Sequence, residues 1–155
     1  MSKRRVVITG MGIISPVGLT LDENWSNITN GVSGIGRIDR FDPEGYPCQI
    51  AGQVDGFDPA NYMPPKEAKK MDRFIQMGMA ASLDAFRDSG LEVTEANAER
   101  IGVYVGSGIG GIESIENATL TLNNRGVRRV SPFFVPSAII NTVSYTHLTL
   151  PTTGS

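Results

Sequence analysis

The sequence has 155 residues, the length of one ordinary domain or of a piece of a larger one, and its composition is 40% hydrophobic and 19% charged, as in globular proteins. A net charge of -2 gives no overall attraction to nucleic acid or to an anionic membrane, and no apolar run approaches the length of a membrane span. A single cysteine, Cys48, excludes an internal disulfide, and the apolar run after the basic N-terminus is too short for a signal peptide. We therefore expect a cytoplasmic protein.

The beginning of the chain predicts a buried strand. Residues 3–9 contain three β-branched apolar residues in succession, a pattern typical of a strand that is buried on both faces. Gly10 and Gly12 then predict a turn. A glycine pair after a strand also begins the dinucleotide-binding motif, so a nucleotide-dependent oxidoreductase is an alternative function. That function requires an acidic residue near position 30, where the sequence has Asn30.

The next segment predicts one short helix and a long irregular region. Asp22 is a suitable N-cap for a helix over residues 23–30, which Gly31 would close. Residues 31–64 are rich in Gly, Pro and Asp and predict an irregular excursion with a short strand near residues 49–54.

The second half of the chain alternates helices and strands, which is the pattern of an α/β fold. Two prolines open a long helix over residues 65–89, and residues 101–106 predict a second buried strand. A polar helix over residues 112–122, a loop over residues 125–136 and a helix from Ser137 onward follow.

A glycine-rich segment at residues 106–111 separates the second strand from the polar helix. Its backbone amides could meet an anion, and Ser107 could act as a nucleophile only beside a base that the sequence does not supply. We favour close backbone packing of the glycines, with Ile109 as the one side chain that projects toward a ligand.

Two basic clusters flank these elements. Lys66, Lys69 and Lys70 fall in the first turns of the predicted long helix, where cations oppose the helix dipole. This unfavourable placement favours a docking surface for an acidic partner over an ordinary solvated face. Arg125, Arg128 and Arg129 form the second cluster, in a predicted loop, and arginine is suited to carboxylate or phosphate groups.

Two aromatic side chains and one thiol are further candidates for binding or catalysis. Phe133 and Phe134 lie between two prolines and either fill the core or line an apolar pocket. Cys48 has no His or Lys beside it and is interpreted as an ordinary thiol.

The last twelve residues, 144–155, do not continue the helical pattern before them. Residues 143–152 resemble the translation of a transposon-end adapter used to prepare sequencing libraries, and the alternative is a divergent natural tail. We predict that residues 1–143 are one partial domain and that residues 144–155 are an artefact. The only histidine, His147, lies in this tail and receives no catalytic role.

Four segments together resemble the β-ketoacyl-[acyl carrier protein] synthases of bacteria, specifically the synthase II type. They are RRVVITGMGIISPVG at residues 4–18, KKMDRFIQMGMAA at 69–81, RIGVYVGSGIGGI at 100–112 and SPFFVPSAIIN at 131–141. The resemblance covers nearly all of residues 1–143, in register and without large gaps.

This resemblance implies a thiolase-like layered α/β fold, of which the chain is the N-terminal half, with a mixed central sheet and helices. It implies decarboxylative condensation of an acyl thioester with malonyl-[acyl carrier protein] in fatty acid biosynthesis, in a homodimer and with no organic or metal cofactor. The family's catalytic Cys and two His residues would lie beyond residue 155, so we expect the chain alone to be inactive. A non-catalytic partner subunit of the chain-length-factor type is the alternative.

The resemblance also implies two kinds of binding residue. Ile109 matches the residue that gates the acyl pocket across the dimer interface, and Phe134 matches an aromatic that lines this region. The residues expected to bind the acidic acyl carrier protein are Lys66, Lys69, Lys70, Arg128 and Arg129.

Overall fold

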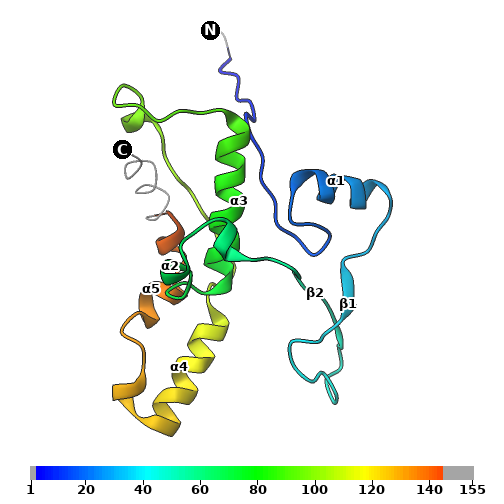
Figure 1. The fold of residues 1–155 in the computed structure, drawn as a ribbon, viewed down its shortest axis with the longest axis vertical. Coiled ribbons are helices and arrows are strands. Elements are labelled where there is room, and N and C mark those ends of the chain that lie inside the picture. The colour runs from blue at the N-terminus through cyan, green and yellow to red at the C-terminus, as the bar shows by residue number, and fades with distance from the viewer. Residues whose placement is uncertain (1–2, 145–155) are drawn as a thin grey trace. The chain divides into compact units, whose positions relative to one another are not determined.

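The computed structural model describes residues 3–144 of the chain (Figure 1). Its regular elements, in chain order, are α1 (Leu21–Thr29), β1 (Ile35–Arg37), β2 (Ile50–Gly52), α2 (Pro65–Ala68), α3 (Arg73–Ser89), α4 (Ile112–Arg125) and α5 (Phe134–Ala138). Single 3-10 turns occur at Pro59–Asn61, Ala98–Arg100 and Val127–Arg129. Residues 145–155 of the expected tail, including His147, and residues 1–2 lie outside the described part.

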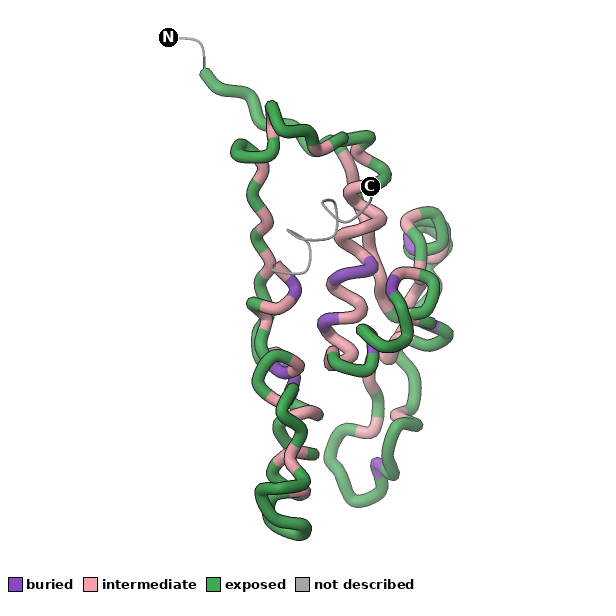
Figure 2. Tube along the Cα trace, turned by 60° about the vertical axis from the view of Figure 1, so that its left-hand side comes forward, coloured by how far each residue is buried: buried purple, intermediate pink, exposed green. Residues whose placement is uncertain are grey.

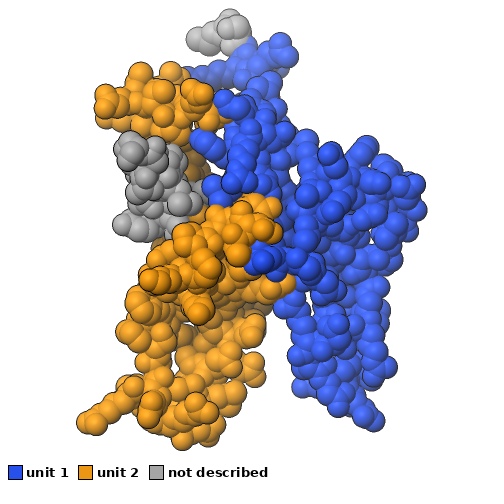
Figure 3. All heavy atoms as spheres, in the orientation of Figure 1, with its two compact units in different colours: residues 1–58, 81–90 blue, residues 59–80, 91–155 orange. Residues whose placement is uncertain are grey.

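The chain forms two compact units, coloured separately in Figure 3. The first unit contains residues 1–58 and 81–90, and the second contains residues 59–80 and 91–155. Helix α3 contributes its beginning to the second unit and its end to the first.

Helix α1 confirms the predicted short helix but corrects its cap. The N-cap is Thr20, whose side chain accepts a hydrogen bond from the Glu23 amide (3.2 Å), so Asp22 lies inside the first turn. The Glu23 carboxylate accepts from the Leu19 amide (2.8 Å), which closely resembles a capping box. Gly31 closes the helix as predicted, with φ of 69° and a hydrogen bond from the Val32 amide to the Asn27 carbonyl.

A two-stranded antiparallel hairpin follows in the first unit. Strand β2 confirms the short strand predicted near residues 49–54 and pairs with β1, so that Ile35 lies opposite Gly52 and Arg37 opposite Ile50. All three residues of β1 are exposed.

The predicted strands over residues 3–9 and 101–106 are absent from the structure, and these predictions were wrong. Neither segment has a paired strand beside it within residues 3–144, so neither can form the ladder of backbone hydrogen bonds that defines a strand. Val6 is 94% exposed and Tyr104 is 98% exposed. A run of apolar residues therefore does not by itself produce a strand.

Gly10 and Gly12 pack against the side of α3 within the first unit. A Cβ atom on Gly12 would lie 2.0 Å from the Ala81 carbonyl oxygen, and one on Gly10 would lie 2.3 Å from that of Ala85. These glycines therefore permit a close backbone approach to a helix side. A bound pyrophosphate needs a helix N-terminus instead, so this geometry does not support the oxidoreductase alternative.

The helix predicted over residues 65–89 is two helices, because Asp72 begins a new one. The Asp72 carboxylate accepts from the Phe74 amide (3.3 Å), while the Ile75 and Gln76 amides donate to the Asp72 carbonyl. Asp72 thus acts as the N-cap of α3. The Gln76 side-chain amide donates to the Ala68 carbonyl (2.8 Å) and so caps the end of α2.

This break alters the argument from the helix dipole. Lys69 and Lys70 follow the C-terminus of α2 rather than occupying the first turns of a long helix. The helix dipole therefore does not disfavour these two lysines, and only the surface that they form favours a docking role.

The core of the second unit is small and apolar. Ile75 and Met79 of α3 and Val143 are fully buried, and Met63 and Ala68 join them. Figure 2 shows buried positions repeating along one side of α3. Gly78 lies on that side, where a Cβ atom would meet the Val143 side chain at an ordinary 3.7 Å.

Helices α4 and α5 complete the second unit. Helix α4 confirms the predicted polar helix and extends it to Arg125, after which Gly126 adopts φ of 79°. Helix α5 begins at Phe134, three residues earlier than the predicted Ser137, and part of the predicted loop is the turn at Val127–Arg129. Within residues 3–144, no helix combines the length and apolar character required to cross a bilayer.

Candidate functional site

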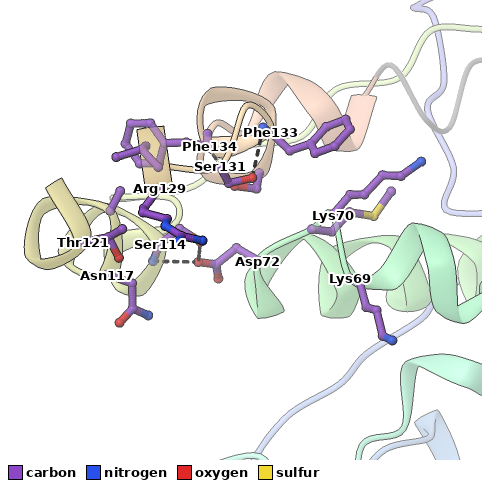
Figure 4. A pocket seen from close by; sticks show the side chains of 14 residues that line it. Lys69, Lys70, Asp72, Ser114, Asn117, Thr121, Arg129, Ser131, Phe133 and Phe134 are labelled. Atoms are coloured by element: carbon purple, nitrogen blue, oxygen red, sulfur yellow. Dashed lines mark hydrogen bonds between the residues drawn. The ribbon is translucent and has the colours of Figure 1, made fainter. Parts of the chain in front are cut away.

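A basic cavity of about 310 Å³ lies in the second unit (Figure 4). Lys69 and Lys70 approach it from the segment between α2 and α3, and Arg129 approaches from the turn after α4. Its polar lining also includes Asp72, Ser114, Asn117, Thr121 and Ser131, and its aromatic lining consists of Phe133 and Phe134.

The cations at this cavity differ in their partners. The Lys70 ammonium lies 2.8 Å from the Glu67 carboxylate and 5.7 Å from the centroid of the Phe133 ring, which places it for a cation–π contact. Among the described residues, neither Lys69 nor Arg129 forms an ion pair, so both charges remain available to an anionic partner.

Three of the five predicted docking residues line this cavity, and two do not. Lys66 lies in α2 and Arg128 lies beside Arg129 in the 3-10 turn, but neither is among the described residues that line the cavity. The structure therefore concentrates the predicted basic surface on Lys69, Lys70 and Arg129.

Asp72 links three elements around the cavity, and sequence reasoning missed this role. One carboxylate oxygen accepts from the Ser114 hydroxyl (2.6 Å) and from the Ser114 amide (3.2 Å), while the other accepts from Phe74. Figure 4 shows Asp72 directed from the start of α3 toward Ser114. An aspartate directly before a helix was the available signal for the cap, but its long-range partner in α4 has no local signature.

An apolar cavity of about 410 Å³ lies in the same unit. Ile109 and Phe134, the two residues predicted to line an acyl pocket, both line it. Its other apolar side chains are Ile115, Val135, Ile139 and Ile140. Ile109 is 74% exposed, in agreement with the expectation that its side chain projects from the glycine-rich segment.

The close backbone packing predicted for the glycine-rich segment is confirmed at Gly110 and Gly111 but not at Gly106 and Gly108, where an added Cβ atom would meet nothing within 4 Å. The Gly111 amide donates to the Ala138 carbonyl (3.0 Å). A Cβ atom on Gly110, which has φ of 86°, would lie 2.9 Å from the same carbonyl oxygen. Larger residues at Gly110 would therefore separate α4 from α5 and displace Ile109.

Phe134 lines both cavities, so the two share a wall. A basic surface that can bind an anionic partner thus adjoins an apolar space that can hold a hydrocarbon chain. The Ser107 hydroxyl accepts from the Gly110 amide (3.0 Å), which assigns it a structural role in the turn. The Cys48 thiol is exposed in the first unit and contacts the Ile50 carbonyl (3.3 Å). The part of the chain that the structure describes brings together no metal-binding group of His, Cys, Asp and Glu side chains.

Comparison with known proteins gives one family. Residues 3–147 match the family model of the β-ketoacyl synthase N-terminal domain. The match leaves residues 148–155 outside the family, and it includes the first residues of the segment predicted to be an artefact.

Individual relatives agree with this match. The chain is 55% identical to the 3-oxoacyl-[acyl-carrier-protein] synthase 2 of Vibrio cholerae over 144 residues. These residues are 93% of this chain and 35% of that protein. The solved ishigamide ketosynthase/chain length factor aligns with a TM-score of 0.75 and 29% identity, over 96% of this chain and 37% of its own. A second solved structure is described as a type II PKS acyl-carrier protein in complex with its ketosynthase bound to the hexaketide. It aligns with a TM-score of 0.74 and 25% identity, over 93% of this chain and 38% of that chain. The chain thus has the thiolase-like α/β fold of these enzymes and spans about a third of their length.

Proposed function

Because the chain belongs to the β-ketoacyl synthase family, we propose that it is the N-terminal part of a 3-oxoacyl-[acyl carrier protein] synthase that elongates acyl chains in fatty acid biosynthesis. One observation carries this proposal. A cavity bordered by Lys69, Lys70 and Arg129 shares the Phe134 wall with an apolar cavity that contains Ile109. An acidic carrier and its acyl chain require these two surfaces side by side.

The proposed reaction has two stages. A cysteine thiolate attacks the acyl thioester and releases the carrier thiol, which forms an acyl-enzyme. Malonyl-[acyl carrier protein] then loses carbon dioxide, and the resulting enolate attacks the acyl-enzyme carbonyl to give the 3-oxoacyl carrier and free thiolate. Preorganised hydrogen-bond donors stabilise the developing negative charge. We assign the Cys and the two His residues of this chemistry to the part of the protein beyond residue 155.

The described residues contribute binding rather than bond making. Lys69 and Arg129 attract the acidic carrier, because opposite charges at an interface steer association and fix orientation. Lys70, held by Glu67 and Phe133, supplies a positioned charge. Lys66 and Arg128 extend this surface outside the cavity. Ile109 and Phe134 contact the acyl chain, and Ile109 gates its entry.

The expected assembly is a cytoplasmic homodimer, in which Ile109 acts across the dimer interface. The 155-residue chain alone is predicted to be inactive, since its one described thiol, Cys48, has no described base beside it. Incubation of the purified chain with acyl- and malonyl-loaded carrier protein tests this prediction, and any elongated product contradicts it.

The proposal is tested in the full-length protein by reversing the charges at the cavity. We expect the triple variant Lys69→Glu, Lys70→Glu, Arg129→Glu to lose about 100-fold in kcat/KM for acyl carrier protein, because like charges facing each other cost several kcal/mol. The rate of the first stage alone, acylation of the cysteine by a small acyl thioester with no carrier protein present, should change less than about twofold, because that substrate makes no contact with the basic surface.

A matched control reverses three cations elsewhere. Lys3, Arg4 and Arg5 are exposed in the first unit, and their replacement by Glu changes net charge equally. This control should retain wild-type kcat/KM for the carrier substrate. Equal losses in both triple variants would mean that net charge, and not this cavity, attracts the carrier, and no loss in either would refute the docking surface.

A non-catalytic partner subunit is the second candidate, since one structural relative is a ketosynthase/chain length factor. The two functions differ at one residue outside the chain. Sequencing the locus past the codon for Val143 decides between them, because a cysteine at the nucleophile position supports the enzyme and a glutamine supports the partner subunit.

A further inference from the structure

We propose that Asp72 is a positioning residue that sets the shape of the apolar cavity and thereby the acyl-chain length that the synthase prefers. This inference rests on the proposed function. It concerns a residue that contacts neither the acyl chain nor the reacting atoms, and that acts through the helices it joins.

The carboxylate of Asp72 caps two helices at once. One oxygen accepts from the Phe74 amide at the start of α3, and the other accepts from the amide and hydroxyl of Ser114 at the start of α4. Negative charge is favourable at both positions, because the amide dipoles of each helix N-terminus point toward it. A single side chain therefore fixes the start of α4 against the start of α3.

The start of α4 determines the position of Ile109. Only Gly110 and Gly111 separate Ile109 from the first residue of α4, and a Cβ atom on Gly111 would lie 2.9 Å from the Asp72 carboxylate. The Gly111 carbonyl accepts from the Ile115 amide (3.0 Å), so this glycine is fixed to the helix. A shift of α4 away from Asp72 would move Ile109 with it.

Asp72 also fixes the opposite wall of the cavity. Its backbone amide donates to the Ser137 carbonyl in α5 (3.3 Å), the helix that begins with Phe134. The two predicted acyl-contacting residues are thus attached to one residue by separate hydrogen bonds, one through α4 and one through α5.

The chemistry of the side chain makes the role testable. Asparagine has almost the same shape, but it has one acceptor oxygen instead of two and carries no charge. An asparagine at position 72 can cap α3 or accept from Ser114, but its amide nitrogen would then face a donor. Replacing the carboxylate also removes a negative charge from the cavity that is proposed to receive an acidic carrier.

The experiment compares Asp72→Asn with wild type in the full-length protein. The readout is the ratio of kcat/KM for a long (myristoyl) and a short (hexanoyl) acyl carrier substrate. We expect the ratio to change by about fivefold or more, the lower end of typical couplings between sites. The affinity for the carrier should stay equal or rise, because the negative charge is gone. In an Ile109→Ala background the Asp72→Asn change should no longer alter the ratio, because the gate it positions is absent.

Asp88→Asn is the matched control. The Asp88 carboxylate also accepts a backbone amide hydrogen bond over a long sequence separation, from Met11 at 2.8 Å, but within the first unit. Asp88→Asn should leave the ratio of kcat/KM for the long and short substrates unchanged.

The outcomes separate three cases. A shifted ratio in Asp72→Asn, lost in the Ile109→Ala background, supports the inference. Equal losses of kcat/KM for both chain lengths, or an unchanged ratio, overturn it, because a residue needed only for folding acts on both substrates alike. If Asp72→Asn does not fold, Ser114→Ala removes only the 2.6 Å hydroxyl hydrogen bond and takes its place: it must change the ratio, and the change must be lost in the Ile109→Ala background. A wild-type protein that elongates neither substrate refutes the proposed function, and the inference with it.

Discussion

The two compact units differ in what fills their interiors. In the first unit the most buried polar residue is Asn24, which is 2% exposed and hydrogen-bonded to Ser15 and to the carbonyls of Gly18 and Thr20. In the second unit the largest fully buried side chains among the described residues are Ile75, Met79 and Val143.

This difference corresponds to a difference in what each unit does. Hydrogen bonds are directional, so the Asn24 network fixes one path for the irregular chain around α1. Apolar contacts are not directional, and in the second unit they hold α3 against Met63, Ala68 and Val143. Both candidate cavities for the carrier and the acyl chain lie in the apolar unit.

The largest expected effect comes from the apolar core. We expect Ile75→Ala to lower the free energy of unfolding by about 3–4 kcal/mol, because it removes a buried side chain and leaves a cavity. Urea unfolding of the full-length protein measures the loss, and amide exchange locates it. A loss of protection confined to the first unit would contradict the assignment of this core.

The close approach of the N-terminal segment to α3 gives the next effect. Gly12→Ala should cost about 2–3 kcal/mol, since a Cβ atom 2.0 Å from the Ala81 carbonyl oxygen forces the segment and the helix apart. The same measurement on Gly36→Ala serves as the control, because a Cβ atom there meets nothing within 4 Å. Similar stabilities for the two variants would show that this packing is unimportant.

The polar network around Asn24 gives a smaller expected change in stability. Asn24→Leu keeps the branched arrangement of heavy atoms but removes the side-chain donor to the Gly18 and Thr20 carbonyls, which then keep only their backbone donors, and it removes the acceptor of the Ser15 hydroxyl. The loss of these side-chain hydrogen bonds should cost about 1–2 kcal/mol. A more stable Leu variant would show that the first unit, like the second, is held mainly by apolar burial.

The smallest effect is expected at the edge of the basic cavity. Glu67→Gln breaks an exposed ion pair with Lys70 and should lower stability by less than about 0.5 kcal/mol. It should raise kcat/KM for the carrier substrate by about twofold, because it removes a negative charge from the docking surface. Asp84→Asn, which breaks the comparable ion pair with Arg87, is the control and should leave this rate unchanged.

The helices could be predicted from local signals, and the sequence placed α1, β2 and α4 within a few residues. The two predicted strands were wrong because a strand depends on a pairing strand that can lie far away in the sequence. The apolar runs at residues 3–9 and 101–106 predicted strands, but a strand forms only against another strand, and the described residues place none beside them. The break at Asp72 was missed because the residues around it favour a helix, and a capping carboxylate decided between one helix and two.

The candidate site was accessible to sequence reasoning only in part. Residue patterns singled out Ile109 and three of the basic residues, and the resemblance to a family added their roles and that of Phe134; all five lie at two adjoining cavities. The link between Asp72 and Ser114 joins residues 42 positions apart and leaves no periodic or motif signal. Such a contact becomes visible only when the helices are packed.

The uncovered segment at residues 6–8 affects how the protein must be produced. Val6, Val7 and Ile8 leave the ribosome early, with apolar side chains and backbone hydrogen-bonding groups facing water. Such a segment can bind a chaperone or the same segment of a second chain. Self-association at residues 6–8 should therefore lower the yield of folded protein, and a lower expression temperature or added chaperone should raise it.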